Sequence, residues 1–310
     1  MDAFHLVSIA DLSERDLGEV FATARELKSR RSRGQAVNSL AGKTLAMIFQ
    51  KPSRRTRVSF EVGMSQLGGH ALYLSPEEIG LGKREAVKDV ARVLSGYVDG
   101  IMARTFAHQT VQELARHALV PVINGLSDYS HPCQALADML TALEEFGDVR
   151  GRTWAFIGDG NNVARSLCFL CGRMGVRLRL AAPEGYQLSD DFLAEAAEAC
   201  PNFEYHWDKD PAEAARGADV LYTDTWTSMG QEGERQAREK AFAGYQVNGE
   251  LLRMAGPKAI VLHCLPAYRG LEITDEVIDG PQSRVFQQAE NRMHTQKAVL
   301  HLLLQKPRKK

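Results

Sequence analysis

Apolar and polar positions along the chain fall into two kinds of alternating segment. Short apolar runs have the length of buried strands, and the longer stretches between them repeat apolar residues at helical spacing. The strand-like runs are residues 44–49, 100–102, 120–123, 154–157, 176–181, 220–222 and 260–263. The clearest helix-like stretches are residues 87–96, 111–118, 134–146, 163–174 and 289–305. This alternation predicts parallel βαβ units with right-handed crossovers.

The chain has 310 residues, which is long for a single hydrophobic core. A charged, glycine-containing stretch at residues 144–152 separates one set of strand–helix units from the next. We therefore expect an α/β protein with two doubly wound parallel-sheet domains, residues 1–148 and 149–286. Residues 287–310 are expected to form a C-terminal helix that packs back towards the first domain.

Composition narrows the class of protein and its location. Hydrophobic residues make up 44% and charged residues 25%, as in ordinary soluble proteins. The formal net charge of -1 provides no overall field to attract nucleic acid or an anionic membrane. No apolar run reaches the roughly 20 residues of a membrane span, and the N-terminus has no signal-peptide pattern. Five scattered cysteines indicate a reducing compartment, so we expect a cytoplasmic protein.

Residues 49–57 (FQKPSRRTR) follow a predicted strand and open a predicted helix. Ser53 is a suitable N-cap, which would leave backbone N–H groups and the positive end of the helix dipole facing outward. Two hydroxyls and three guanidinium groups add donors that match phosphate oxygens. A solvated basic turn is the alternative, but the strand-to-helix position favours an anion site.

The Ser-x-Arg-Thr-Arg pattern resembles the carbamoyl-phosphate loop of the aspartate and ornithine carbamoyltransferases. The resemblance implies that the side chains of Ser53, Arg55 and Thr56 bind the phosphate, and that Arg54 contributes its backbone N–H. Arg57 is the last motif position, with either a phosphate contact or a partly structural role.

Three further positions match carbamoyl-phosphate ligands of the family. Arg104 follows a short predicted strand. His131 and Gln134, in His-Pro-Cys-Gln before a predicted helix, are implied to contact the carbamoyl oxygen and the carbamoyl nitrogen. Arg292 matches a C-terminal arginine that also contacts the carbamoyl oxygen.

Residues 158–163 (GDGNNV) form a glycine turn between a predicted strand and helix, as a dinucleotide loop does. The third glycine of such a loop is absent because Val163 occupies its place, so nicotinamide binding is the weaker interpretation. In the ornithine branch of the family the second asparagine contacts the amino-acid end of the substrate, which assigns that role to Asn162. We expect no cofactor, and no residue cluster has the spacing of zinc ligands.

The segment from Asp224 to Gly230 resembles the Asp-x-x-x-Ser-Met-Gly signature of the ornithine branch. The resemblance implies that Asp224 pairs with the α-amino group of the substrate. It also implies that Ser228 and Met229 contact the same amino-acid end.

His-Cys-Leu-Pro, residues 263–266, is also typical of the ornithine branch. It implies that Cys264 lies beside the reacting amine, and that Cys264 and the Leu265 carbonyl contact carbamoyl phosphate. A cysteine nucleophile with His263 as its base is disfavoured, because adjacent strand residues point to opposite faces.

The expected reaction is attack by the δ-amine of L-ornithine on carbamoyl phosphate, giving L-citrulline and phosphate, as in arginine biosynthesis. The active site is expected in the cleft between the two domains. The residues expected to be catalytic are Arg55, Arg104, His131, Cys264 and Arg292. Three alternatives remain: a carbamoyltransferase for putrescine or an N-acylated ornithine, a nicotinamide-dependent dehydrogenase, and a non-catalytic sensor.

The resemblance also implies a homo-oligomer, either a trimer or a multiple of trimers. Residues 75–85 match a loop that often offers a glutamine to the active site of a neighbouring subunit. Gly80 falls at that position, so it is open whether the loop makes this contact, with Lys83 or Arg84 as possible replacements.

Overall fold

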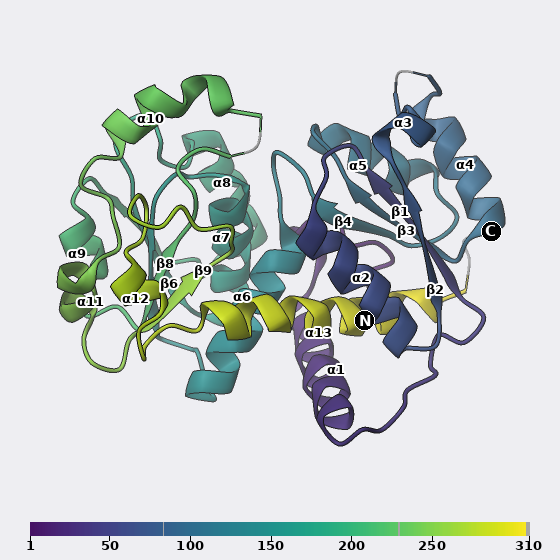
Figure 1. The fold of residues 1–310 in the computed structure, drawn as a ribbon, viewed down its shortest axis with the longest axis horizontal. Coiled ribbons are helices and arrows are strands. Elements are labelled where there is room, and N and C mark those ends of the chain that lie inside the picture. The colour runs from purple at the N-terminus through teal and green to yellow at the C-terminus, as the bar shows by residue number, and fades with distance from the viewer. Residues whose placement is uncertain (83, 229, 308–310) are drawn as a thin grey trace. The chain divides into compact units, whose positions relative to one another are not determined.

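The computed structural model describes residues 1–82, 84–228 and 230–307, and the chain forms two compact units. Unit 1 comprises Met1–Ala137 and Asn291–Lys310, and unit 2 comprises Asp138–Glu290. Each unit contains one parallel β-sheet flanked by helices (Figure 1). The α/β class with two parallel sheets is therefore confirmed.

The sheet of unit 1 has the strand order β2-β1-β3-β4, with every pair parallel. Its strands are β1 (Thr44–Phe49), β2 (His70–Leu74), β3 (Gly100–Arg104) and β4 (Val122–Leu126). The chain runs from β1 outward to β2, then returns to the other side of β1 to form β3. The strand order thus reverses between β1 and β3, and such reversals open a crevice at the carboxyl ends of the two strands.

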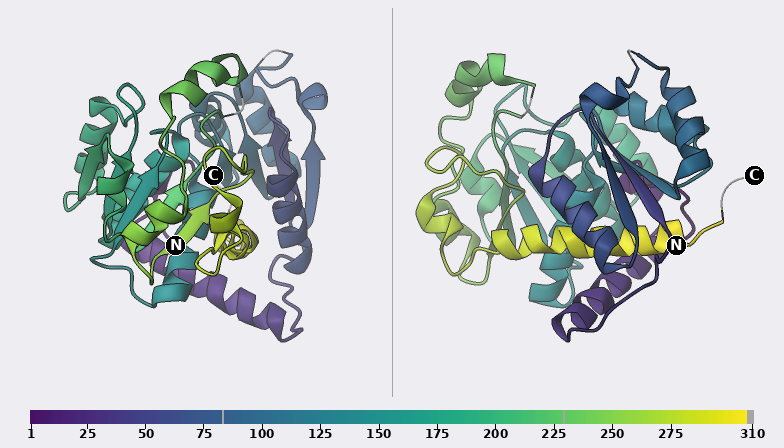
Figure 2. Two further views of the ribbon diagram at one scale, coloured as in Figure 1. Left: turned by 60° about the vertical axis from the view of Figure 1, so that its left-hand side comes forward. Right: turned by 45° about the vertical axis from the view of Figure 1, so that its right-hand side comes forward.

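Helices of unit 1 connect these strands and cover the sheet. They are η1 (Ile9–Asp11), α1 (Glu14–Ser32), α2 (Arg54–Gln66), α3 (Pro76–Ile79), α4 (Val87–Tyr97) and α5 (His108–His117). The boundaries between the two units fall within two helices, α6 (Pro132–Phe146) and α13 (Val285–Leu304). Lys28 on α1 bonds Asn291 on α13 at 2.7 Å, and both views of Figure 2 show α13 as one continuous helix.

The sheet of unit 2 has the order β7-β6-β5-β8-β9, again all parallel. Its strands are β5 (Thr153–Ile157), β6 (Arg177–Ala181), β7 (Tyr205–Asp208), β8 (Val220–Thr223) and β9 (Ile260–His263). Its helical segments are α7 (Asn162–Met174), α8 (Asp190–Ala199), α9 (Pro211–Ala215), η2 (Glu232–Glu234), α10 (Arg235–Ala241), α11 (Gly249–Ala255) and α12 (Asp275–Ile278). The order reverses between β5 and β8, which gives unit 2 a crevice of the same kind.

The central strands form the core of each sheet, whereas one edge strand of each sheet, β2 or β7, is only partly buried. β3 and β5 are buried at every position, whereas all positions of β2 and β7 are exposed or half-buried. The seven predicted strands are all present, but β2 and β7 are additional. These two edge strands lack the continuous apolar run of a buried parallel strand, whereas the opposite edge strands, β4 and β9, are almost entirely buried and were predicted. Among the described residues, the structure contains no helix long and apolar enough to span a membrane.

Candidate functional site

The crevice of unit 1 is lined by residues that directly follow β1 and β3. β1 ends at Phe49 and α2 begins five residues later, with Ser53 as its extended N-cap. The Ser53 hydroxyl accepts a hydrogen bond from the backbone N–H of Thr56 at 3.4 Å. β3 ends at Arg104, so an arginine and the positive end of a helix dipole lie at the same edge of the sheet.

Side chains from three separate parts of unit 1 lie within hydrogen-bonding distance of the Thr56 hydroxyl. Its oxygen lies 3.1 Å from the Ser53 hydroxyl, 3.4 Å from Nη1 of Arg104 and 3.2 Å from Nη2 of Arg292. Thr56 is fully buried, and both arginines are 5% exposed. The fold therefore brings Arg292, 236 residues further along the chain, to the predicted phosphate loop.

His131 and Gln134 lie at the start of α6, and both are buried. Burial lowers the pKa of His131 well below its ordinary value, and the nearby guanidinium groups of Arg292, Arg104 and Arg55 lower it further. The imidazole is therefore neutral at pH 7 and can donate a hydrogen bond without adding charge. Three arginines near a neutral histidine favour a ligand that carries negative charge.

The remaining arginines of the loop have different surroundings. Arg54 and Arg55 are exposed at the first turn of α2. Arg57 is also exposed, but its Nε pairs with Glu61 at 2.9 Å and its guanidinium lies 4.0 Å from the ring centroid of Tyr73. These neighbours give Arg57 a structural role in holding α2 beside β2.

The crevice of unit 2 carries Asp224 after β8 and the glycine loop after β5. Asn161 is the N-cap of α7, and its Oδ1 accepts from the N–H groups of Val163 and Ala164 at 2.9 and 3.1 Å. Its Nδ2 donates to Oδ2 of Asp224 at 2.9 Å. Asn162, the residue predicted to contact the substrate, is the first residue of α7, and the neighbouring Asn161 is the one that bonds the carboxylate of Asp224. The preference of asparagine for N-cap positions was the available signal.

Gly160 explains why the glycine loop is a poor fit to a dinucleotide. A Cβ atom at this position would lie 2.7 Å from the backbone at Gln187 and Leu188. The glycine is thus required by a close approach of the protein's own backbone, whereas in a dinucleotide loop it leaves room for pyrophosphate. Asn161 already occupies the N–H groups that would bind the pyrophosphate.

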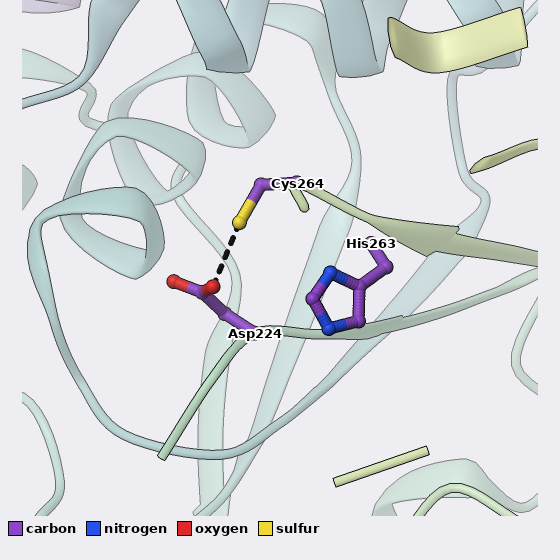
Figure 3. Close-up of side chains that lie close together, drawn as sticks. All are labelled: Asp224, His263 and Cys264. Carbon is purple, nitrogen blue, oxygen red and sulfur yellow. Dashed lines mark hydrogen bonds between the residues drawn. The ribbon is translucent and has the colours of Figure 1, made fainter. Parts of the chain in front are cut away.

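Cys264 follows β9 and points at Asp224 (Figure 3). Its thiol donates to Oδ1 of Asp224 at 2.7 Å, and the backbone N–H of Thr225 donates to the same oxygen at 2.7 Å. Cys264 is partly exposed, whereas the other four cysteines are buried. The carboxylate of Asp224 is 7% exposed, so it is a constrained acceptor beside an accessible thiol.

The His263 ring lies beside Asp224 and Cys264, but Figure 3 draws no hydrogen bond from it to either residue. Its Nε2 lies 3.1 Å from Oε1 of Glu272, and its Nδ1 accepts from the backbone N–H of Leu265 at 2.9 Å. Both ring nitrogens thus have partners other than the thiol, which argues against a cysteine–histidine nucleophile even though the expected separation of the two side chains on opposite faces is not seen.

Ligand atoms of Asp224, His263 and Cys264 lie within 4.8 Å of one another and could approach a metal ion. Because both nitrogens of His263 already make hydrogen bonds, a metal would have to displace one of them. That no metal binds here stays a prediction.

The loop after Asp224 is held by long-range contacts that local sequence patterns do not predict. Nη1 of Arg238, on α10, donates to the Trp226 carbonyl at 3.1 Å and to Oδ2 of Asp159 at 2.8 Å, which joins this loop to the glycine loop. Burial raises the pKa of Asp159, although the contact with Arg238 opposes that rise. The Ser228 N–H bonds Gln231 Oε1 at 3.1 Å. The predicted ligand Met229 lies outside the described residues.

Comparisons with known proteins agree with this division of chemistry between the units. The model of the aspartate/ornithine carbamoyltransferase carbamoyl-P binding domain matches residues 5–144, and that of the Asp/Orn binding domain matches residues 150–303. The ornithine carbamoyltransferase of Bacillus subtilis is 53% identical over 307 residues, covering 97% of this chain and 94% of that protein. That of Archaeoglobus fulgidus is 51% identical, covering 97% and 98%. A solved structure of the Pyrococcus furiosus ornithine carbamoyltransferase superposes with a TM-score of 0.94, at 48% identity and 97% coverage of both chains.

Proposed function

The chain belongs to the aspartate/ornithine carbamoyltransferase family, and from that premise we propose the reaction that it catalyses. It transfers the carbamoyl group of carbamoyl phosphate to the δ-amine of L-ornithine and releases L-citrulline and phosphate. One observation carries the proposal: the crevice of unit 1 is an arginine-rich anion site, and the crevice of unit 2 presents a fixed carboxylate beside a thiol. Each crevice suits one of the two substrates.

We assign the phosphate of carbamoyl phosphate to the start of α2. The N–H groups there and the guanidinium groups of Arg55 and Arg104 stabilise charge as it grows on the departing phosphate. His131, Thr56 and Arg292 serve the carbamoyl oxygen, and Gln134 the carbamoyl nitrogen. Each donor to the developing oxyanion is worth about 3–4 kcal/mol in systems where one has been removed. The ligands assigned to carbamoyl phosphate are Ser53, Arg54, Arg55, Thr56, Arg104, His131, Gln134, Cys264, Leu265 and Arg292.

We assign the amino-acid end of ornithine to the loops after β5 and β8. Asp224 accepts from the α-amino group, and Asn162, Ser228 and Met229 contact the same end of the substrate. Cys264 lies beside the amine that reacts. An amine like that of lysine has a pKa of about 10.4, so its deprotonation at pH 7 requires about 4.6 kcal/mol. Loss of solvent on binding lowers this requirement.

The reaction forms one bond and breaks another. The neutral amine attacks the carbamoyl carbon, the carbon–oxygen bond to phosphate breaks, and phosphate leaves with the electron pair while the nitrogen loses a proton. Attack requires both substrates to be bound at the same time and at bonding distance from each other. Correct placement of two reactants contributes up to about 7–11 kcal/mol, and exclusion of water protects carbamoyl phosphate from hydrolysis.

We also propose that the protein is a cytoplasmic homo-oligomer, a trimer or a multiple of trimers. Val58 and Val62 on α2 and Leu72 on β2 are exposed by 50%, 37% and 41%, which supports a covered apolar surface on unit 1. Size-exclusion chromatography with light scattering would show a mass that is a multiple of three chains. A monomeric mass would contradict the proposal.

Citrulline formation by purified protein tests the reaction. Carbamoyl phosphate is supplied with ornithine, aspartate, putrescine or N-acetylornithine in parallel, and each carbamoylated product is measured. A signal with ornithine alone supports the proposed substrate. A signal with another amine would retain the anion site and replace the assignment of unit 2, and no signal with any amine would favour a sensor.

A further inference from the structure

We propose that His263 and Glu272 form a positioning pair, which orients the turn that carries Cys264 and Leu265. The inference rests on the proposed function for its catalytic consequence, because that function places the Cys264 thiol and the Leu265 carbonyl against the substrates. His263 is a positioning residue that acts through this turn and touches neither substrate.

The hydrogen bonds of His263 determine which of its nitrogens carries the proton. Nδ1 accepts from the backbone N–H of Leu265 at 2.9 Å, so Nδ1 is unprotonated. The proton of the neutral ring is therefore on Nε2, which donates to Oε1 of Glu272 at 3.1 Å. The two side chains are 0% and 1% exposed, so water does not compete for these bonds.

The turn requires such support because Leu265 has an unfavourable backbone conformation. Its φ of 56° lies in the left-handed region, and it is the one non-glycine residue with positive φ in the described part of the chain. A leucine adopts this conformation only where surrounding contacts impose it. The bond from the Leu265 N–H to His263 is one such contact.

Glu272 and Gln288 fix the pair from two further directions. Oε1 of Glu272 also accepts from the backbone N–H of Tyr268 at 2.6 Å, which ties the far end of the turn to the same carboxylate. Oε1 of Gln288 accepts from the backbone N–H of His263 at 2.8 Å. Nε2 of Gln288 in turn donates to Asp138 at 2.6 Å and to the Tyr222 hydroxyl at 3.2 Å. The side chain and the backbone of His263 are thus both held.

Two substitutions at position 263 separate the two contacts of the imidazole. His263→Asn retains an acceptor oxygen near the position of Nδ1, so the Leu265 N–H keeps a partner. His263→Gln places its amide near Nε2 and leaves the Leu265 N–H unpaired. We expect kcat/KM for ornithine to fall about tenfold or more in His263→Gln, and to stay within about threefold of wild type in His263→Asn.

Substitutions of Glu272 provide the rescue and the control. Glu272→Ala removes the acceptor of Nε2–H, whereas Glu272→Gln retains an acceptor oxygen. We expect kcat/KM for ornithine to fall about tenfold in Glu272→Ala and to stay close to the wild-type value in Glu272→Gln. Glu276→Gln makes the same chemical change at an exposed carboxylate on α12 and is expected to leave activity unchanged.

Two measurements test the pair without reference to ornithine. The alkylation rate of Cys264 by iodoacetamide, followed by mass spectrometry of its peptide, reports the position of the turn, because the other four cysteines are buried. It is expected to change in His263→Gln and Glu272→Ala and to stay near wild type in His263→Asn. The ring nitrogens of His263 in ¹⁵N-histidine-labelled wild-type protein, assigned by the signal lost in His263→Asn, are expected to show protonated Nε2 and bare Nδ1.

The proposal is overturned by a protonated Nδ1. It is also overturned if the asparagine and glutamine variants lose activity equally and alkylate at the wild-type rate. If His263→Gln does not fold, the proposal is tested by the activity and alkylation rate of the Glu272 variants and by the tautomer of His263 in the wild-type protein. If the wild-type protein forms no citrulline, the proposed function fails, while the tautomer and the alkylation rates still test the positioning pair.

Discussion

At the scale of single residues, the site of unit 1 depends on how charge and burial are divided among its side chains. Thr56, Arg104 and Arg292 are buried and hold one another, whereas Arg55 is exposed beside them. These buried residues therefore contribute to the stability of the fold. Arg55 can be changed with little effect on the folded protein, because exposed side chains contribute little to stability.

Arg55→Ala should remove activity without unfolding the protein. We expect kcat/KM for carbamoyl phosphate to fall by at least about 100-fold, because a charged donor to the phosphate is lost. The melting temperature should stay near that of wild type. Steady-state kinetics and differential scanning fluorimetry measure the two effects, and Arg92→Ala, which removes an exposed arginine on α4, is the control. Unchanged turnover in Arg55→Ala would contradict the phosphate assignment.

The lowered pKa of His131 links stability to pH. An unfolded histidine has a pKa of about 6.5, and the folded pKa of His131 is well below its ordinary value. As the pH falls below about 6.5, the unfolded state binds a proton that the native state does not, so stability decreases. The contribution is at most about 1.4 kcal/mol per pH unit.

Urea unfolding at pH 7.5 and pH 5.5 measures this linkage. We expect wild type to lose more free energy of unfolding between the two pH values than His131→Gln does. The control His206→Gln changes an exposed histidine on β7 and should lose as much free energy of unfolding between the two pH values as wild type does. Equal losses in wild type and His131→Gln would show that this imidazole is not held neutral by the fold.

At the scale of elements, each candidate site is placed by a reversal of strand order. The anion site follows β1 and β3, and the carboxylate of Asp224 follows β8 next to the loop after β5. Helices α2 and α7 both start at these reversals, and a side chain caps each of them, Ser53 and Asn161. The two caps differ in that Asn161 also donates a hydrogen bond to the carboxylate of Asp224.

Two substitutions of Asn161 should separate its capping role from its contact with Asp224. Asn161→Asp keeps a good N-cap but replaces the amide donor to Asp224 with a second carboxylate. It should raise the KM for ornithine while changing the melting temperature little. Asn161→Ala loses both functions and should also destabilise the protein by about 1 kcal/mol.

Asn248 offers a matched control for the capping role. It caps α11 through the N–H groups of Glu250 and Leu251. Asn248→Ala should therefore lose a similar free energy of unfolding and leave the KM for ornithine unchanged. If Asn161→Asp binds ornithine as wild type does, the bond to Asp224 has no part in substrate binding.

At the scale of the whole molecule, the two crevices carry complementary charge on separate units. The arginines of the first crevice lie close together with a neutral histidine, so this crevice is rich in positive charge. Binding of an anion relieves the repulsion between these arginines. A ligand that binds only the native state also stabilises the protein by mass action.

Inorganic phosphate should therefore raise the melting temperature on its own. At 100 times its dissociation constant the gain is about 2.7 kcal/mol. Differential scanning fluorimetry with increasing phosphate measures the shift, with sulfate and chloride at matched ionic strength as comparisons. The shift should be absent in Arg55→Ala and retained in Arg92→Ala. An equal shift in both variants would mean that phosphate binds elsewhere.

The sequence by itself determined which elements form in the cores and which residue types follow them. Apolar runs and helical spacing are local properties, so the central strands and the motifs after them could be read from the chain. The N-cap at Ser53 and the arginines beside it were equally local. The edge strands β2 and β7 could not be read, because a partly exposed strand has only a weak apolar pattern.

Only the tertiary structure decided which distant residues meet. Thr56 contacts Arg292 across 236 residues, and Cys264 contacts Asp224 across 40. The family resemblance implied a substrate contact for each of these four residues, but it did not predict that they contact one another. Glu272 had no signal in the sequence, because its bond to His263 depends on the path of the turn between them. Strand order and turn geometry result from packing of the whole chain, and local periodicity does not encode them.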